Sequence, residues 1–174
     1  MHLRKAQEAD VPALLDLING YAQRNLLLPR TEASLRARLG DFLVAERGGE
    51  LVGCGALSPL GPGLGEIRSL AVRADCGGHG LGSRIVRALM DQAQERGFLE
   101  VLTLTRRVSL FASMGFTVTR RERFLDKLAA DCAACPMNLG CDETALLWEP
   151  EGAEAFDIKM ARVLDTPREG AAAR

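Results

Sequence analysis

Apolar residues recur every three to four positions in several parts of the chain, which is typical of helices with one buried face. This spacing predicts four helices: one that begins after Asp10, one over 32–39, one from Ser83 to Gly97, and a short one that ends at Gly115. Pro12 supports the first start, because proline is favoured in the first turn of a helix. Thr31 supports the second start, because its hydroxyl can cap backbone N–H groups.

Short apolar runs between these helices predict strands. The expected strands cover 42–47, 50–57, 64–72, 98–105 and 117–122. Gly48 and Gly49 separate the first two runs, which indicates a tight hairpin, and "GPG" at 61–63 indicates another turn. The run over 98–105 is almost continuously apolar, which predicts burial on both faces. This order of elements predicts an α/β (α+β) fold with one mixed sheet.

A glycine-rich segment, "CGGHGLGS" at 76–83, joins a predicted strand to a predicted helix. Backbone N–H groups at such a helix start can hold a diphosphate without a metal ion. A dinucleotide-binding fold requires an acidic residue at the end of the next strand, but that strand ends in "TRR". A nucleoside-triphosphate loop requires Gly-Lys-Ser/Thr, and "GLGSR" lacks the lysine. The alternative is a turn with no ligand, but the strand–loop–helix setting favours a ligand.

Composition and charge exclude several classes of protein. The chain has 174 residues and a formal net charge of −1, which suits one domain and gives no basic field for nucleic acid. No apolar run approaches the roughly 20 residues of a membrane span, and the first ten residues lack the apolar stretch that is typical of a signal peptide. Five cysteines, an odd number, predict a reducing, cytoplasmic environment. We expect a domain over 1–149 and a peripheral helix or flexible tail over 150–174.

The segment "LAVRADCGGHGLGSRIVRALMDQA" resembles the acetyl-CoA-binding motif of the GNAT superfamily of N-acetyltransferases, Arg/Gln-x-x-Gly-x-Gly/Ala. Gly77 stands where the motif usually has Arg or Gln, which removes one side-chain contact. "LFASMGF" resembles the closing "FYxxxGF" segment of the superfamily. The resemblance implies the GNAT fold, a mostly antiparallel mixed sheet flanked by helices, with acetyl-CoA as cosubstrate. It implies these cofactor-binding residues: Leu70, Ala71, Val72, Gly77, Gly78, His79, Gly80, Leu81, Gly82 and Ser83.

Within these residues, the resemblance gives each part of acetyl-CoA a place. The diphosphate would lie on the amides of Gly78 to Ser83. The pantetheine arm would pair with the backbone of Leu70 and Val72, where neighbouring strands part.

Three further segments resemble the acetyltransferase domain of N-acetylglutamate synthases: "LLLPRT", "CGALSPLGPGLGEIRSLAV" and "VLTLTRRVSLFASMGF", with "ETALLW" after them. The likeness is to the short bacterial form, which lacks an amino-acid-kinase domain, so arginine feedback does not follow. It implies acetylation of the α-amino group of L-glutamate, the first step of arginine biosynthesis, with L-glutamine as an alternative acceptor. It also implies that Arg30 and Arg106 hold the acceptor's carboxylates. Leu28, in the same segment as Arg30, is a further candidate for substrate binding.

Catalysis requires a base, because an amine is protonated at neutral pH and must lose a proton before it attacks. By resemblance, Glu66 occupies the position of the general base. Strand alternation places Glu66 and Arg68 on one face, and Arg68 is a further candidate for the acceptor site. A solvated Glu–Arg pair is the alternative. Phe111 replaces the tyrosine acid of the family, which leaves thiolate protonation to water or to another group such as Ser109.

The segment "DCAACPMNLGCDE" contains Cys132, Cys135 and Cys141. Structural zinc requires four ligands, so these three cysteines are one short. A fourth ligand is sought among Cys76, His79, His2 and Glu143. Buried thiols, a redox pair or an adventitious disulfide are the other interpretations. No metal is expected in catalysis.

Other functions stay open. A GNAT enzyme can acetylate a polyamine, an antibiotic or a protein N-terminus, but cationic acceptors favour an acidic groove rather than Arg30, Arg68 and Arg106. Arg107 is expected to face away by alternation. A non-catalytic acyl-CoA sensor is the third alternative. Relatives are often dimers, so the expected partners are acetyl-CoA, a small amino acid and a second copy in a homodimer, with no nucleic acid and no membrane.

Overall fold

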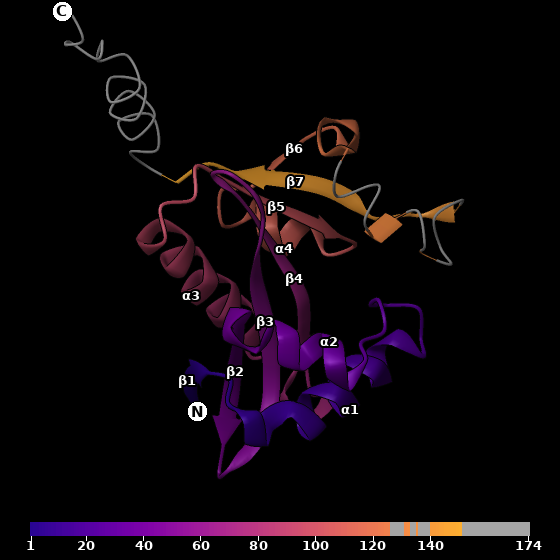
Figure 1. Ribbon diagram of the computed structural model, residues 1–174, viewed down its shortest axis with the longest axis vertical. Helices are drawn as coiled ribbons and strands as arrows, with labels where there is room; N and C mark the ends of the chain where they lie inside the picture. The colour runs from indigo at the N-terminus through magenta and orange to yellow at the C-terminus, as the bar shows by residue number, and fades with distance from the viewer. Residues whose placement is uncertain (126–130, 133–134, 136–139, 151–174) are drawn as a thin grey trace, which may run out of the picture.

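One twisted sheet organises the chain, and its strands come from both ends of the sequence (Figure 1). The computed structural model describes residues 1–125, 131–132, 135 and 140–150. Within these residues seven strands follow the order β1-β2-β3-β4-β5-β7-β6. The strands are β1 (His2–Lys5), β2 (Phe42–Arg47), β3 (Glu50–Gly61), β4 (Leu64–Val72), β5 (Glu100–Thr105), β6 (Thr117–Val118) and β7 (Thr144–Trp148). Only the pairing of β4 with β5 is parallel among them, so the expected mixed, mostly antiparallel sheet is confirmed.

Helices cover both faces of this sheet. The helices are α1 (Val11–Ala22), α2 (Glu32–Ala37), α3 (Leu81–Glu95) and α4 (Val108–Ala112), with short 3-10 turns η1 (Glu8–Asp10), η2 (Leu39–Asp41), η3 (Ala74–Cys76) and η4 (Arg121–Arg123). The first two helices pack on one face through Leu14, Ile18 and Leu35. The third packs on the other face through residues that include Ile85 and Leu89. The four predicted helices are therefore confirmed, with α3 beginning two residues earlier than expected.

Local sequence signals explain several of these boundaries. Thr31 accepts a hydrogen bond from the backbone N–H of Ser34, whose hydroxyl in turn accepts from the N–H of Thr31, which makes a capping box. Gly48 and Gly49 both have positive φ and form the two-residue turn between β2 and β3. A Cβ at Gly55 would lie 2.9 Å from the Ile85 side chain, so this glycine lets α3 approach the sheet closely.

The sequence did not reveal the strands at the two ends of the described chain. β1 pairs with β2, and β7 inserts between β5 and β6. The expected strand over 117–122 is wrong beyond Val118, because the chain turns into η4 at Arg121. The expected tail over 150–174 lies outside the described residues except for Pro150, and the division at residue 149 stays a prediction.

The sheet opens between its two central strands. The parallel pairing of β4 with β5 ends at Glu66, which lies opposite Leu102. Past this point β4 continues along β3, whereas β5 continues along β7. The register of β4 against β3 shifts near Ser69, which has a φ of 52°. This bulge lies where the strands part, and it positions the site described next.

Candidate functional site

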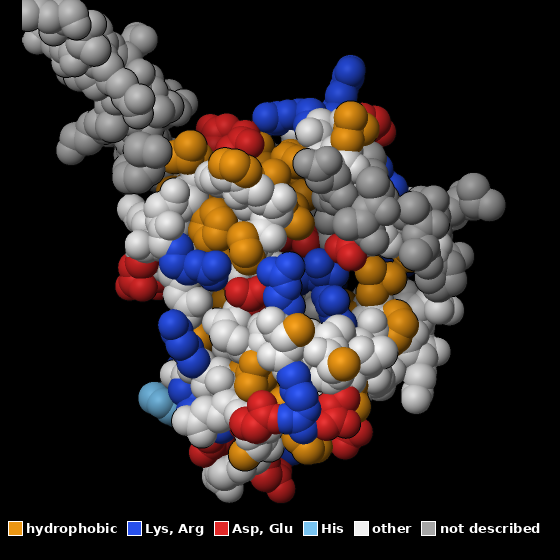
Figure 2. All heavy atoms as spheres, viewed as in Figure 1, with side chains coloured by type: hydrophobic (Ala, Val, Ile, Leu, Met, Phe, Trp, Pro, Cys, Tyr) orange, Lys and Arg blue, Asp and Glu red, His pale blue; other side chains and the backbone are white. Residues whose placement is uncertain are grey.

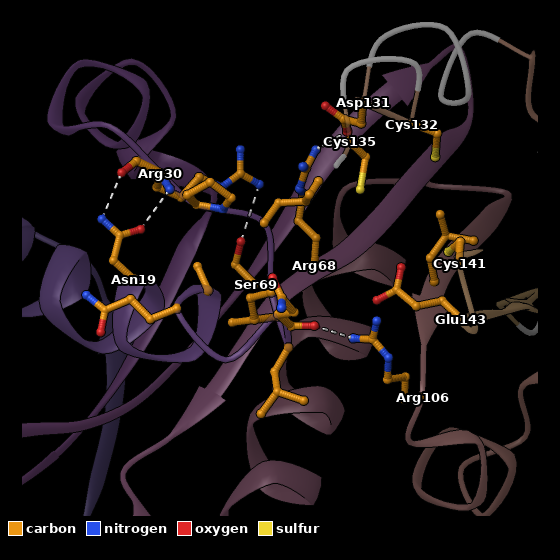
Figure 3. A pocket seen from close by; sticks show the side chains of 18 of the residues that line it. Asn19, Arg30, Arg68, Ser69, Arg106, Asp131, Cys132, Cys135, Cys141 and Glu143 are labelled. Atoms are coloured by element: carbon orange, nitrogen blue, oxygen red, sulfur yellow. Dashed lines mark hydrogen bonds and ion pairs between the residues drawn. The ribbon is translucent and has the colours of Figure 1, made fainter. Parts of the chain in front are cut away.

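A pocket of about 470 Å³ lies where β4 and β5 part. Basic and acidic side chains gather near the middle of the face drawn in Figure 2, and Figure 3 shows the pocket from close by. Its lining comes from α1, the loop before α2, β4, the end of β5 and the segment before β7. We call it the acceptor pocket. Its lining includes the four residues predicted to bind the acceptor, Leu28, Arg30, Arg68 and Arg106. It also includes the predicted base, Glu66.

Glu66 is the most buried charged side chain of the pocket, with 2% of its surface exposed. Arg68, two residues along the same strand, places its Nη1 atom 3.3 Å from Glu66 Oε2. The same Nη1 atom donates to Asp131 Oδ2 at 2.9 Å. The predicted alternation on β4 is therefore correct, and the Glu–Arg pair is buried in a pocket rather than solvated. A buried carboxylate at the bottom of a pocket is placed to accept a proton from a ligand.

Arg30 is fixed in the pocket by a side chain from α1. Asn19 Nδ2 donates to the carbonyl of Arg30 at 3.0 Å, and Asn19 Oδ1 accepts from the N–H of Arg30 at 2.9 Å. The guanidinium donates from Nη2 to Ser69 Oγ at 3.3 Å. Burial, and then the positive charge of Arg68, lower the pKa of Arg30. An anionic ligand beside this guanidinium would stabilise its charged form.

Arg106 extends from the end of β5 toward the same pocket. Its Nε donates to Asp142 Oδ1 at 2.5 Å, and its Nη1 donates to the carbonyl of Asn25 at 3.0 Å. The Arg106 hydrogen bond lowers the pKa of Asp142. These contacts tie the loop before α2 to the segment before β7 across the pocket. Arg107 is exposed and does not line the pocket, as predicted from alternation.

Charges of both signs line the acceptor pocket. The described lining includes three guanidiniums and three carboxylates, from Arg30, Arg68, Arg106, Glu66, Asp131 and Glu143. Arg68 and Arg106 each have a carboxylate within ion-pair distance. Among the described residues no carboxylate lies within 4.0 Å of the Arg30 guanidinium. Of the three guanidiniums, Arg30 is thus the one whose charge a ligand carboxylate would stabilise most.

The glycine loop forms a separate feature at the start of α3. Gly78 and Gly80 have φ values of 77° and 74°, a conformation that favours glycine. The first hydrogen bond of the helix runs from the N–H of Arg84 to the carbonyl of Gly80, so the amides of Leu81, Gly82 and Ser83 precede the bonded ladder. A Cβ at Gly78, Gly80 or Gly82 would meet nothing within 4 Å. This open surface suits close approach of an anion to the helix start.

The other residues predicted to bind the cofactor lie beside this loop. Leu70 and Val72 are on the part of β4 that β5 has left, and Tyr21 donates its hydroxyl to the carbonyl of Val72 at 2.5 Å. The Ala71 side chain is buried in the core against α1, so it offers only its backbone. Gly77 has an ordinary φ of −70°, and its carbonyl lies 2.7 Å from His79 Nδ1.

Phe111, which replaces the tyrosine acid of the family, and Ser109, a suggested proton source, do not line the described part of the acceptor pocket. Phe111 is buried in the core and contacts Phe116 edge to face, with ring centroids 5.2 Å apart. Its position in this chain therefore serves packing. Ser109, one suggested source of a proton, is exposed on α4 and is not part of the described pocket lining, and its role stays a prediction.

The three cysteines near the end of the described chain lie around the acceptor pocket. Cys132, Cys135 and Cys141 line it. Within the part of the chain that is described, no group of three or more His, Cys, Asp or Glu side chains is arranged to hold a metal ion. Of the suggested fourth ligands, Cys76 is buried in the α3 core, His2 is in β1 and His79 is in the glycine loop, whereas Glu143 lines the pocket.

Sequence reasoning missed several residues of the pocket, including Asn19, Ser69 and Asp131. Asn19 had a weak signal, because it is a polar residue directly after the apolar face of the first predicted helix. The left-handed conformation of Ser69 has no sequence signal. Asp131 reaches Arg68 across 63 positions of sequence, a contact that only the fold reveals.

The described residues include no helix with the length and apolar character needed to cross a bilayer.

Comparison with known proteins agrees with this geometry. Residues 11–117 match the family model described as "Acetyltransferase (GNAT) family". An uncharacterized N-acetyltransferase of Chlorobaculum tepidum is 34% identical over 145 residues, which cover 83% of this chain and 94% of that protein. An amino-acid acetyltransferase of Mycobacterium tuberculosis is 40% identical over 118 residues, which cover 66% of this chain and 67% of that protein.

Solved structures give the same result. A Mycobacterium tuberculosis protein in complex with CoA has a TM-score of 0.76 at 30% identity, covering 86% of this chain and 99% of that one. N-acetylglutamate synthase from Neisseria gonorrhoeae, complexed with coenzyme A and N-acetyl-glutamate, has a TM-score of 0.74 at 25% identity. The match covers 85% of this chain but 34% of that one. Likewise, the chain spans about a quarter of the amino-acid acetyltransferase of Shewanella oneidensis, 26% of its length at 30% identity.

Proposed function

The chain belongs to the acetyltransferase (GNAT) family, and we propose that within it the chain acetylates the α-amino group of L-glutamate or L-glutamine. It is an N-acetyltransferase of the GNAT type, and acetyl-CoA is its cosubstrate. The identity of the acceptor is the proposal. A relative is named amino-acid acetyltransferase, and a structural neighbour holds N-acetyl-glutamate, which supports this choice of acceptor.

One observation carries the proposal: a buried carboxylate and an arginine without a carboxylate partner face the same pocket. Glu66 is a buried residue of the pocket lining. Among the described residues, no carboxylate lies within ion-pair distance of Arg30. An α-amino acid brings one ammonium group and one carboxylate, separated by a single carbon. The pocket offers an acceptor for the proton of the first and a planar donor pair for the second. A simple polyamine has no carboxylate that could bind to Arg30.

The mechanism follows from these two positions. Bound acetyl-CoA supplies the thioester carbonyl that the amine attacks. Arg30 holds the carboxylate of the acceptor, while Glu66 takes one proton from its ammonium group. The freed nitrogen lone pair forms the N–C bond, the C–S bond breaks, and the second proton passes from the nitrogen to solvent as the amide forms. The sulfur leaves as a thiolate and takes a proton from solvent, so the products are the N-acetyl amino acid and CoA.

The glycine loop and β4 are assigned to acetyl-CoA in this proposal. The amides of Gly78 to Ser83 hold the diphosphate, and the free side of β4 at Leu70 and Val72 holds the pantetheine arm. Support comes from the positive φ values of the loop and from the open surface above Gly82. If the acceptor is glutamate, the enzyme acts at the first step of arginine biosynthesis, and we place it in the cytoplasm.

The test is product identification by mass spectrometry. Purified enzyme is incubated with acetyl-CoA and, in separate reactions, with each common L-amino acid, with spermidine and with a short peptide. We expect N-acetylglutamate or N-acetylglutamine as the main product, with stoichiometric release of CoA. Turnover of spermidine or the peptide but of no free amino acid would overturn the proposal. CoA binding without any turnover would favour a sensor.

A further inference from the structure

A second pocket, of about 480 Å³, borders the acceptor pocket. Its wall toward the acceptor pocket is made by Arg30, Arg68 and Asp131, which line both. The remainder of its lining comes from α2, β2 and β3, and includes Arg38, which does not line the acceptor pocket. We call it the second pocket. Nothing in the proposed reaction uses it.

Positive charge exceeds negative charge along its lining. Three guanidiniums, from Arg30, Arg38 and Arg68, face the single carboxylate of Asp131 among the described lining residues. Arg68 already has Glu66 and Asp131 as partners. Arg38 has only a distant contact, 3.8 Å from Nη1 to Asp41 Oδ2, among the described residues. The two arginines of this lining without a close carboxylate in the described part of the chain are therefore Arg30 and Arg38, and the Arg38 side chain is 60% exposed at the mouth of the pocket, where it is free to turn toward a ligand.

Arg30 shows the need for an anion most clearly. Its Nε atom is buried and has no hydrogen-bond partner among the described residues, and the same is true of Arg68 Nε, but Arg68 has two carboxylates beside its Nη1 atom. Burial and the neighbouring charges of Arg68 and Arg38 lower the pKa of Arg30. A buried donor without a partner is costly, and an oxyanion beside it would satisfy the donor and offset the repulsion between the guanidiniums.

The other side of the second pocket is apolar. Leu35, Phe42 and Ala56 line it, each with at most 4% of its surface exposed. Pro59 and Leu60 are more exposed and present the accessible part of this apolar side. An inorganic anion would leave it uncovered. A carboxylate on a short hydrocarbon stem would contact both the arginines and the apolar side.

We propose that the second pocket binds a small organic carboxylate between Arg30 and Arg38, next to the acceptor and distinct from it. Because Arg30 also faces the acceptor pocket, the bound anion weakens the hold of Arg30 on the acceptor's carboxylate. Occupancy therefore raises KM for the acceptor and leaves KM for acetyl-CoA unchanged. The binding itself is independent of the proposed function, whereas the effect on the acceptor rests on it.

Butyrate is the probe, since it has one carboxylate, a short apolar stem and no amine to acetylate. Binding is followed by NMR on isotope-labelled protein, in the wild type, in Arg38→Gln and in Arg106→Gln. We expect shifts at the backbone amides of α2, an affinity that falls about tenfold in Arg38→Gln, and a change below about twofold in Arg106→Gln. The unliganded spectra of both variants verify that they are folded.

Three binding results would overturn the proposal. In the first, Arg38→Gln binds butyrate as tightly as the wild type. In the second, affinity is lost in Arg106→Gln alone, which would place the ligand in the acceptor pocket. In the third, inorganic phosphate binds at α2 and butyrate does not.

The kinetic arm separates this inference from the proposed function. Saturating butyrate should raise KM for glutamate in the wild type and leave it unchanged in Arg38→Gln. An unchanged KM in the wild type, with butyrate bound, would refute the coupling. Absence of turnover of both glutamate and glutamine, together with normal butyrate binding, would refute the proposed function and leave the second pocket standing.

Discussion

At the scale of single residues, the account depends first on Glu66, a carboxylate that is almost fully buried beside Arg68. Replacement of Glu66 by Gln preserves the size of the side chain and removes its ability to take a proton. General bases contribute roughly 10²–10⁴-fold to rate, so we expect kcat to fall by at least about 100-fold. KM for acetyl-CoA should change little. Steady-state release of CoA measures both.

Asp131→Asn is the matched control for Glu66→Gln. It also removes a carboxylate partner of Arg68 from the same pocket, without removing the proposed base. A smaller loss of kcat in Asp131→Asn than in Glu66→Gln identifies proton transfer as the lost function. Equal losses would mean that Glu66 acts only by holding Arg68.

Asp10 is a buried carboxylate whose ionisation makes the stability of the fold depend on pH. It accepts hydrogen bonds from Arg4 at 2.7 and 2.9 Å and from the N–H of Gln7, and 11% of its side chain is exposed. The Arg4 hydrogen bonds, ahead of the opposing effect of burial, lower the pKa of Asp10 from its ordinary value of 3.8. A lowered pKa contributes stability above pH 3.8, and this contribution is lost as pH falls through the lower folded-state value.

We therefore expect Asp10→Asn to lower the free energy of unfolding by about 1–3 kcal/mol at pH 7. The difference in free energy of unfolding between variant and wild type should shrink as pH falls below 3.8, because the wild-type carboxyl then becomes protonated and its ion pair with Arg4 is lost. Urea unfolding across this pH range is the measurement. Asp16→Asn, an exposed change on the adjoining helix α1, should cost under about 0.5 kcal/mol. An acid-insensitive difference for Asp10→Asn would contradict the assignment.

At the scale of elements, the start of α3 is assigned to the diphosphate of acetyl-CoA. Gly82 has ordinary helical geometry and nothing within 4 Å of a built Cβ, so Gly82→Val should fold normally. Its branched side chain would lie where the diphosphate approaches the amides. We expect acetyl-CoA affinity to fall at least tenfold, about 1.4 kcal/mol, by isothermal titration calorimetry.

Gly20→Val is the comparison for Gly82→Val. Gly20 is also a helical glycine with open space around it, but it is in α1. Its replacement should leave acetyl-CoA affinity unchanged. If both variants bind acetyl-CoA like the wild type, the glycine loop does not hold the diphosphate.

The segment before β7 brings three thiols to the rim of the acceptor pocket. Cys132, Cys135 and Cys141 are partly exposed, whereas Cys54 is buried, and burial raises the pKa of the Cys54 thiol to about 12. The thiolate is the reactive form, so iodoacetamide should modify the first three and spare Cys54. Modification should remove most acceptor turnover, and a saturating acceptor should slow it. Mass mapping together with activity checks this, and full activity after triple modification would contradict the position of the segment.

Elements with local signals were predictable, and elements defined by distant pairing were not. Thr31 caps α2, and Gly48 and Gly49 turn the first hairpin, because each acts within a few residues of itself. β1 forms because His2 pairs with Glu46 in β2, and β7 forms because Trp148 pairs with Val101 in β5. The paired residues are over 40 positions apart in each case. A short run of residues cannot reveal such partners.

The same distinction applies to the candidate site. Glu66, Arg30 and Arg106 were found through resemblance of their segments to a family, and the fold brings them to one pocket. The bulge at Ser69, the Asn19 clamp and the contact from Asp131 were not predicted. These residues hold the arginines in place, and their partners lie between 11 and 63 positions away.

At the scale of the whole molecule, the division of the sheet gives each substrate its own side. β4 contributes Glu66 and Arg68 to the acceptor pocket and then continues toward the glycine loop, paired with β3 but no longer with β5. No residue of the loop over 77–83 is part of the described lining of the acceptor pocket. The two substrates should therefore respond independently to changes on either side of the opening.

The measurement that tests this most directly is steady-state kinetics of Arg30→Lys with both substrates varied. Lysine keeps the charge but lacks the planar fork that grips a carboxylate. Charged hydrogen bonds contribute about 1.5–3 kcal/mol, so kcat/KM for glutamate or glutamine should fall roughly 10- to 100-fold, and Arg106→Lys should behave similarly. KM for acetyl-CoA should stay unchanged, and the exposed Arg107→Lys should match the wild type throughout. Wild-type kcat/KM for both amino acids in Arg30→Lys and in Arg106→Lys would contradict recognition of the acceptor through its carboxylates.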